Sequence, residues 1–215
     1  MEYKSIRIDE LTIGDHYNLN IADECYFIME YTVGAGYADS TYSLIHNFKK
    51  TLDKRGLPEW QYKALAIRKI ARIFRLLYVP GIDLARTTLV PIPPSKRRGD
   101  PLFDSRMTQV LHMACPDADI KELITTKESL EASHNSEVRG ERRPSLETIQ
   151  GNLQINEDLA NNIKPTIILF DDVITVGTHF VACKNLLTAR FPDVKVIGMF
   201  VARRAIPAVN VDDYL

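Results

Sequence analysis

The run from Thr166 to Thr178, TIILFDDVITVGT, constrains the fold of this chain more than any other segment. Its four apolar residues, 167–170, are typical of a buried strand, and two adjacent carboxylates, Asp171 and Asp172, follow at the carboxyl end of that strand. A short Thr/Gly loop comes next, and we expect a helix over 178–190 and a further strand over 194–201. A strand–helix–strand pattern of this kind predicts an α/β fold with a mostly parallel central sheet flanked by helices.

The polar residues of the same run suit a sugar phosphate. Carboxylates accept hydrogen bonds from the vicinal hydroxyls of a ribose. Backbone N–H groups and threonine hydroxyls converge at a helix N-terminus, where the dipole favours an anion and a glycine lets the backbone approach closely. We therefore expect a ribose 5-phosphate cradle made of Asp171, Asp172, Thr175, Val176, Gly177 and Thr178. The alternative is an ordinary buried strand that ends in a turn, as in response regulators with paired acids, and it leaves the Thr-Val-Gly-Thr loop unexplained.

A second anion site is predicted after another strand. Residues 87–92 have the character of a central strand, and a basic loop follows it, made of Ser95, Lys96, Arg97 and Arg98. Arginine binds phosphate oxygens bidentately, and lysine adds a point charge. Because the carboxyl ends of parallel strands lie at the same edge of a sheet, we expect this loop beside the acid pair. Taken alone, a Lys-Arg-Arg turn is more often a solvated loop.

The remaining segments predict further elements. We expect a strand over 25–33, a helix after Asp39, and a second helix from Pro58. The basic residues of that second helix are interpreted as a solvated face, namely Lys63, Lys69, Arg72 and Arg75. A helix is expected over 102–113 with Asp100 as its N-cap, and a short strand over 120–124. The polar stretch 125–150 lacks apolar periodicity, and we expect it to be irregular and either functional or disordered.

Composition bounds the class of protein. With 215 residues the chain can bury a good core as one α/β domain with a small appended lobe. A net charge of −1 and an apolar fraction of 45% give no support for non-specific nucleic-acid binding. No apolar run approaches the roughly 20 residues of a membrane span, and the amino terminus lacks a signal-peptide core. The three distant cysteines favour neither a disulfide framework nor a zinc site, so we expect a cytoplasmic protein.

The run 166–178 resembles the 5-phosphoribosyl-1-pyrophosphate (PRPP) motif of the type I phosphoribosyltransferases, in which two acids and two apolar residues precede Thr-x-Gly-Thr. Other segments resemble the ComF branch, whose members were first associated with competence and DNA uptake. These segments are MEYTVGAGY over 29–37, SLIHNFKK over 43–50, and the Val-Pro-x-Pro strand with its Arg-Gly turn over 90–99. ComF proteins usually carry a four-cysteine zinc ribbon, which this chain lacks. Asp100-Pro101-Leu102 also replaces their Phe-Asn-Gln.

The resemblance implies a type I phosphoribosyltransferase fold, with a hood and helical segment over 1–80 and a PRPP-binding core over 81–215, integrated as one domain. It implies transfer of phosphoribosyl from PRPP to a nitrogenous base or amine, with release of pyrophosphate. Mg²⁺ would arrive with the PRPP, so no metal site made by the protein is expected. A nucleoside 5′-phosphate could occupy the same site. Because family members are often dimers, the implied partners besides these small molecules are a second copy or another protein, and no membrane.

The residue roles also follow from the resemblance. Asp171 and Asp172 would hold the ribose hydroxyls, and Arg142 and Arg143 of a closing loop would bring charge to the leaving pyrophosphate. The implied PRPP-binding set is Asp171, Asp172, Val173, Thr175, Val176, Gly177, Thr178, Ser95, Lys96, Arg97 and Arg98.

Two other functions stay open at the level of sequence. The same cradle could serve a non-catalytic module that senses PRPP or a nucleotide, since several members of the superfamily are regulators. A ComF-like accessory role in DNA handling would instead need a contiguous basic surface, for which the candidates are Lys63, Lys69, Arg72 and Arg75. The near-zero net charge counts against DNA binding without excluding it.

Overall fold

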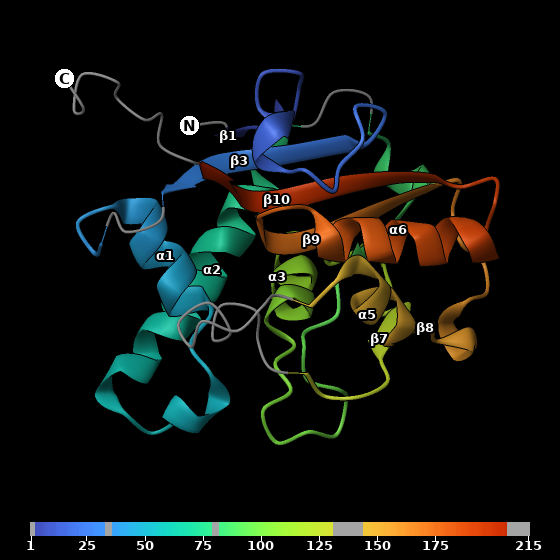
Figure 1. Ribbon diagram of the computed structural model, residues 1–215. Coiled ribbons are helices and arrows are strands. Elements are labelled where there is room, and N and C mark those ends of the chain that lie inside the picture. Colours follow the sequence, from blue (N-terminus) through green and yellow to red (C-terminus); the bar gives the residue numbers. More distant parts are fainter. Residues whose placement is uncertain (1–2, 33–35, 79–81, 131–143, 206–215) are drawn as a thin grey trace.

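The computed structural model describes residues 3–32, 36–78, 82–130 and 144–205. Figure 1 shows a central sheet with helices on both of its faces. The strands are β1 Tyr3–Lys4, β2 Ile6–Arg7, β3 Glu24–Thr32, β4 Leu77–Tyr78, β5 Thr87–Pro91, β6 Asp119–Ile120, β7 Ile124–Thr126, β8 Leu153–Ile155, β9 Thr166–Ile174 and β10 Lys195–Ala205. The α-helices are α1 Ser40–Phe48, α2 Gln61–Arg75, α3 Arg106–Ala114, α5 Leu146–Gly151 and α6 Thr178–Arg190. Short 3-10 turns lie at η1 Ile13–Asp15, η2 Leu52–Lys54, η3 Pro58–Trp60, η4 Leu84–Arg86 and η5 Glu157–Leu159.

The central sheet has six strands in the order β2-β3-β10-β9-β5-β6, and every pairing is parallel except that of the short edge strand β2. The expected α/β class with a mostly parallel sheet is confirmed. The chain leaves β5 through α3 to reach β6 on one side, and it leaves β9 through α6 to reach β10 on the other side. The winding direction therefore reverses between β5 and β9, and the carboxyl ends of these two strands flank the crevice where open α/β sheets bind ligands.

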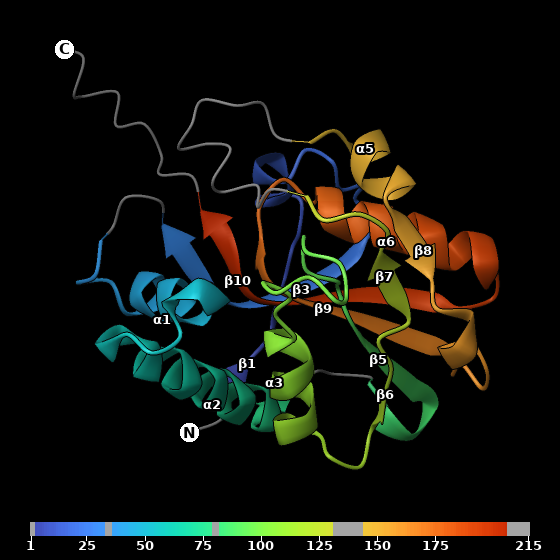
Figure 2. The ribbon, with the colours of Figure 1, turned by 90° about the horizontal axis from the view of Figure 1, so that it is seen from below.

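Alternation along the strands divides the core between the two faces of the sheet. Ile168 and Phe170 of β9 pack in the cluster that includes α1, α2 and α3, whereas Ile167 and Leu169 pack in the cluster that includes α5 and α6. Figure 2 shows the two helical layers on opposite sides of the sheet. Strand β3 lies against β10 over eight residue pairs, so the first 80 residues contribute a strand to the same sheet as the rest of the chain.

Three expectations about the middle of the chain differ from the structure. Helix α3 begins at Arg106 and not at Leu102, because Asp100 uses its side chain and its carbonyl to close a turn with the N–H groups of Leu102 and Phe103. The stretch 125–150 is only partly irregular, since β7 pairs with β8 and α5 packs on α6. The expected strand over 120–124 is also divided between β6 and β7.

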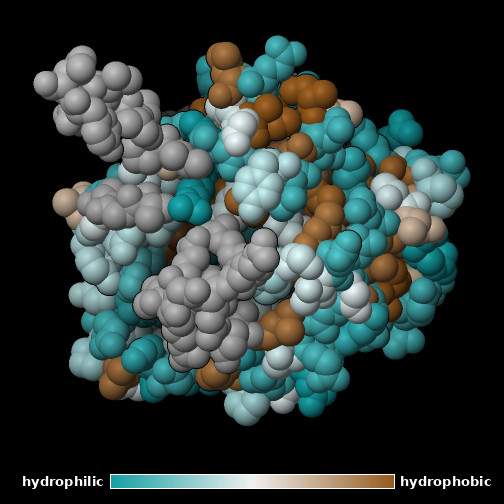
Figure 3. All heavy atoms as spheres, in the orientation of Figure 1, coloured by the Kyte–Doolittle hydropathy of each residue, from teal (hydrophilic) through white to brown (hydrophobic). Residues whose placement is uncertain are grey.

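The surface seen in Figure 3 is largely hydrophilic, with apolar residues in small groups among polar ones. Within the described ranges, no helix combines the length and the apolar character needed to cross a bilayer.

Candidate functional site

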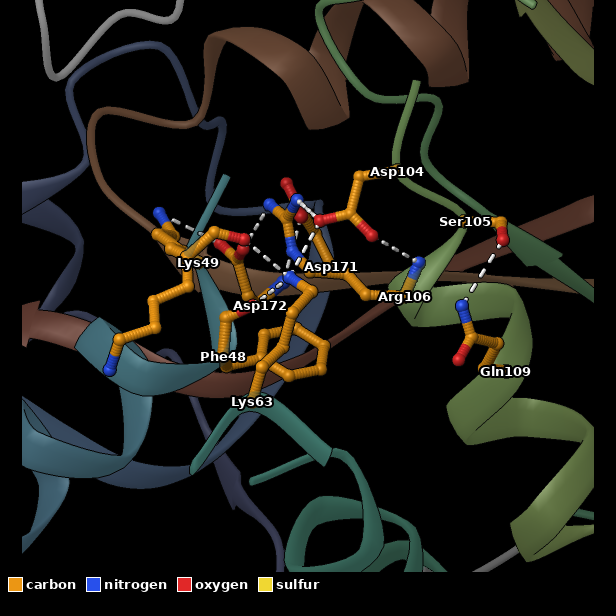
Figure 4. Close-up of polar contacts among 10 residues, drawn as sticks. Phe48, Lys49, Lys63, Asp104, Ser105, Arg106, Gln109, Asp171 and Asp172 are labelled. Atoms are coloured by element: carbon orange, nitrogen blue, oxygen red, sulfur yellow. Dashed lines mark hydrogen bonds and ion pairs between the residues drawn. The ribbon is translucent and has the colours of Figure 1, made fainter. Parts of the chain in front are cut away.

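The acid pair lies at the carboxyl end of β9, beside the end of β5, whose following residue Ile92 donates its N–H to the carbonyl of Phe170 over 2.8 Å. Asp172 is only 4% exposed, and both of its carboxylate oxygens are engaged. Lys49 Nζ lies 3.0 Å from Oδ1, and Arg106 Nη2 lies 2.9 Å from Oδ2 (Figure 4). Asp171 is half-buried, and its Oδ1 accepts the backbone N–H of Asp172 over 2.7 Å. The pair is thus asymmetric: Asp172 is held in ion pairs, and Asp171 makes none with a described residue.

The two carboxyls also differ in pKa, because only Asp172 is paired with cations in the described part of the chain. Burial and the neighbouring charge of Asp172 raise the pKa of Asp171 to about 7, against weaker opposing effects of Lys49 and Arg106. Burial alone would also raise the pKa of Asp172. The charges and hydrogen bonds of Lys49 and Arg106 outweigh that effect and hold the pKa of Asp172 well below its usual range. The site therefore combines a permanent carboxylate with a carboxyl that can exchange a proton near neutral pH.

A buried network extends from Asp172 through Arg106 to a third carboxylate. Arg106 Nη1 lies 3.0 Å from Asp104 Oδ2, and Lys63 Nζ lies 2.8 Å from the same oxygen. Lys63 is 3% exposed and also donates to the carbonyls of Phe48 and Lys50 at the end of α1, over 2.8 and 2.7 Å. The sequence interpretation, which placed Lys63 on a solvated basic face, was therefore wrong for this residue. The network thus sets three cations, Lys49, Lys63 and Arg106, against the carboxylates of Asp172 and Asp104, with the Asp171 carboxyl next to them.

The Thr175–Thr178 loop turns from β9 into α6. Gly177 is the N-cap of α6 and has φ +89°, a conformation that other residues adopt only with strain. A Cβ at Gly177 would lie 2.8 Å from Leu19 Cδ2, so the loop also needs glycine for close packing. Val173 is buried, and its N–H donates to Asp172 Oδ1 over 2.7 Å.

The segment 16–19 lies against this loop. His16 Nδ1 donates to the carbonyl of Thr175, and the N–H of Asn18 donates to the carbonyl of Val176 over 3.0 Å. The Asn18 side-chain amide donates to Thr178 Oγ1 over 2.9 Å. These contacts join residues about 160 positions apart in the sequence.

The basic loop leaves β5 at the same edge of the sheet. Ser95 and Lys96 are half-buried, whereas Arg97 and Arg98 are exposed. Arg98 forms an ion pair with Glu122 and lies over the ring of Phe103, with its guanidinium carbon 5.4 Å from the ring centroid. The N–H of Arg97 donates to Ser129 Oγ over 3.1 Å. The loop is therefore anchored at both of its arginines.

A pocket of about 610 Å³, open to solvent, lies between the acid pair and the basic loop. Its wall includes both acids of β9, Arg98 of the basic loop, Arg106 of α3, and the prolines 91, 93 and 94. A smaller neighbouring hollow is lined by both Ser95 and His179, which places the start of the basic loop near the start of α6. The structure thus brings together the acid pair, the Thr/Gly loop and the basic loop around one edge of the sheet.

Several residues of the site have no signal in the sequence. Lys49, Lys63, Asp104 and Arg106 come from three helices or their flanks, and only the fold brings them to Asp172. His16 and Asn18 lie in a segment without an interpretable motif. The implied lid residues Arg142 and Arg143 lie outside the described residues. Within the described ranges, no group of three or more His, Cys, Asp or Glu residues could hold a metal ion.

Comparisons of the chain with models of protein families and with curated proteins find no match.

Proposed function

We propose that this protein binds PRPP with its Mg²⁺, or a nucleoside 5′-phosphate, and transfers phosphoribosyl from PRPP to a nitrogenous base or amine with release of pyrophosphate. The observation that carries the proposal is the position of three parts at the switch point of the sheet: an acid pair and a basic loop around one pocket, and a glycine-capped helix N-terminus beside the adjoining hollow. PRPP has a diol between two phosphate groups, and this arrangement offers a complementary group for each part.

Each role follows from the surroundings of the residue. Asp171 faces the pocket without an ion pair to a described residue, so its carboxylate can accept hydrogen bonds from the ribose hydroxyls. Gly177 and Thr178 would receive the 5-phosphate at the start of α6. Ser95, Lys96, Arg97 and Arg98 would meet the pyrophosphate.

In the proposed reaction, the acceptor nitrogen forms a bond to C1 of the ribose. The bond from C1 to the pyrophosphate oxygen breaks, and its electron pair leaves with the pyrophosphate. The chain contributes position and charge: the basic loop, together with Arg106 in the wall of the pocket, favours the anion that departs.

The hard oxygen of Asp171 in the pocket suits a hydrated Mg²⁺ that is bound chiefly by substrate phosphates. Mg²⁺ would supply charge neutralisation on the pyrophosphate.

The test is binding of PRPP, with and without Mg²⁺, by calorimetry and thermal unfolding of the wild type and of Asp171→Asn. Asp171 is the better target because replacing Asp172 would break two ion pairs of the fold. A ligand at a hundred times its Kd stabilises a protein by about 2.7 kcal/mol, or several degrees for a chain of this size. We expect that shift in the wild type, and a weaker one in Asp171→Asn. Absence of binding in the wild type would refute the proposal.

A binding module without turnover is the competing function at the same site. Asp172 is already neutralised by Lys49 and Arg106 before any ligand arrives, and such a preformed site can bind without catalysing. Release of pyrophosphate from PRPP in a screen of acceptor bases separates the two: binding with no release from any base favours the sensing module. The DNA-handling alternative loses one of its candidate residues, because Lys63 is buried in the network.

A further inference from the structure

The segment 16–19 contacts each of the four residues of the Thr175–Thr178 loop. His16 donates a hydrogen bond to the carbonyl of Thr175. Asn18 donates its backbone N–H to the carbonyl of Val176 and its side-chain amide to the hydroxyl oxygen of Thr178. Leu19 packs against Gly177. Contacts this dense on so short a loop fix the orientation of its peptide groups.

Residues 16–19 orient two peptide groups of the loop, Thr175–Val176 and Val176–Gly177. A trans peptide holds the C=O of one residue antiparallel to the N–H of the next, and the described part of the chain contains no cis peptide. With the Thr175 carbonyl turned toward His16, the N–H of Val176 points away from His16. With the Val176 carbonyl turned toward Asn18, the N–H of Gly177 points away from Asn18. Neither N–H donates to any residue in the described ranges, so both are available to a ligand.

The hydroxyl of Thr178 is oriented in the same way. Its oxygen accepts from the Asn18 amide over 2.9 Å, so its proton is directed elsewhere and can be donated. His16 must carry its proton on Nδ1, because a carbonyl only accepts. The side chain of His16 is fully buried, and its Nε2 has no partner in the described structure. A second proton there would be buried and unpaired, which favours the neutral ring.

We propose that His16 and Asn18 are positioning residues of the 5-phosphate site, which turn two N–H groups and one hydroxyl of the Thr175–Thr178 loop toward the anion. This inference rests on the proposed function, and it assigns a role in binding to an N-terminal segment that has no motif.

Asn18→Asp tests the inference because it keeps the size of the side chain and reverses its hydrogen bond. The Thr178 hydroxyl must then donate to the new carboxylate, and the added charge repels phosphate. Asn20→Asp is the matched control: it adds the same charge two residues away, at an exposed side chain whose oxygen accepts the N–H of Ala22. The probes are ribose 5-phosphate and inorganic pyrophosphate, measured by calorimetry on the full chain.

We expect Asn18→Asp to bind ribose 5-phosphate about tenfold or more weakly, the usual effect of losing a hydrogen bond to a charged group. Pyrophosphate, which we assign to the basic loop, should bind within about twofold of the wild type, because the hydrogen bonds of Asn18 go to the Thr175–Thr178 loop. Asn20→Asp should resemble the wild type with both ligands.

The possible failures are distinct. If the wild type binds ribose 5-phosphate and Asn18→Asp binds it equally well, the inference is overturned and the proposed function stands. If Asn18→Asp loses both ligands in equal measure, the effect is not local to the Thr175–Thr178 loop, and the inference is again overturned. A wild type that binds neither ribose 5-phosphate nor PRPP overturns the proposed function, and the inference with it.

Discussion

Asp171 and Asp172 are adjacent in the chain, yet they carry different charge near neutral pH. Asp172 is fixed between Lys49 and Arg106, which hold its pKa well below the usual range against the effect of burial. Burial and the charge of Asp172 both disfavour the ionised form of Asp171, and its pKa rises to about 7. A single-residue change therefore has opposite consequences at the two positions.

The free energy of unfolding should show this asymmetry. Asp172→Asn leaves Lys49 and Arg106 without their shared counter-charge, and we expect a loss of about 3 kcal/mol at pH 8, as for other broken buried pairs. Asp171→Asn removes a carboxylate that is costly to ionise and should be at least as stable as the wild type at that pH. Urea unfolding of both variants checks the prediction, and equal losses in the two would contradict it.

The pH dependence of Asp171 has a definite sign. Its folded-state pKa of about 7 lies above its ordinary value of 3.8, so the folded state keeps the proton while the unfolded state loses it. The free energy of unfolding of the wild type should equal that of Asp171→Asn at pH 3.5. The wild type should become less stable than this variant as the pH rises from 3.8 to about 7, and the difference in stability should stay constant at higher pH. Urea unfolding from pH 3.5 to 8.5 measures the difference, and a flat difference would refute the raised pKa.

Among the elements, α1, α2 and α3 are joined by one buried lysine. Lys63 of α2 donates to two carbonyls at the end of α1 and to Asp104, just before α3. Burial lowers the pKa of Lys63, and the Asp104 charge opposes that effect. The contact orients Asp104, which in turn holds Arg106 toward Asp172.

Lys63→Met should therefore destabilise the protein, because Asp104 and the carbonyls of Phe48 and Lys50 lose a donor together. We expect a loss of about 3 kcal/mol in the free energy of unfolding, measured in urea. Lys69→Met is the matched control, since Lys69 is exposed on the same helix and should change stability by no more than about 0.5 kcal/mol. Equal small effects in the two variants would show that the buried contacts of Lys63 contribute little.

At the scale of the whole molecule, the central sheet joins the two ends of the sequence. Strand β3 from the first 80 residues pairs with β10, and β10 pairs with β9, which carries the acid pair. The Thr175–Thr178 loop is likewise held by residues 16–19. Neither the sheet nor the site is complete without both parts of the chain.

This arrangement predicts one cooperative unfolding transition. Trp60 is the only tryptophan, and it lies in the N-terminal part, just before α2. Its fluorescence should change at the same urea concentration as the far-ultraviolet circular dichroism, which reports the helices and sheet together. Two separate midpoints would show that residues 1–80 unfold independently.

Local patterns predicted some elements closely and failed at others. Helix α6 has the predicted bounds 178–190, because a loop with glycine precedes it and an aromatic-proline pair follows it. The predicted start of α3 was wrong, since Asp100 has the residue type of an N-cap but closes a turn instead. The irregular stretch 125–150 was also predicted too broadly, because β7 finds its partner β8 only across a gap in the sequence. Residue type alone does not reveal such distant partners.

By itself, the sequence determined the α/β class, the strand that carries Asp171 and Asp172, and the loop that follows, because these depend on neighbouring residues and their periodicity. The tertiary structure alone decided which acid is neutralised, since Lys49 and Arg106 reach Asp172 from two separate helices. It also decided that Lys63 is buried and that His16 and Asn18 hold the Thr175–Thr178 loop. Charge and hydrogen-bond direction at a site depend on groups close in space, and those groups are brought together only when the chain folds.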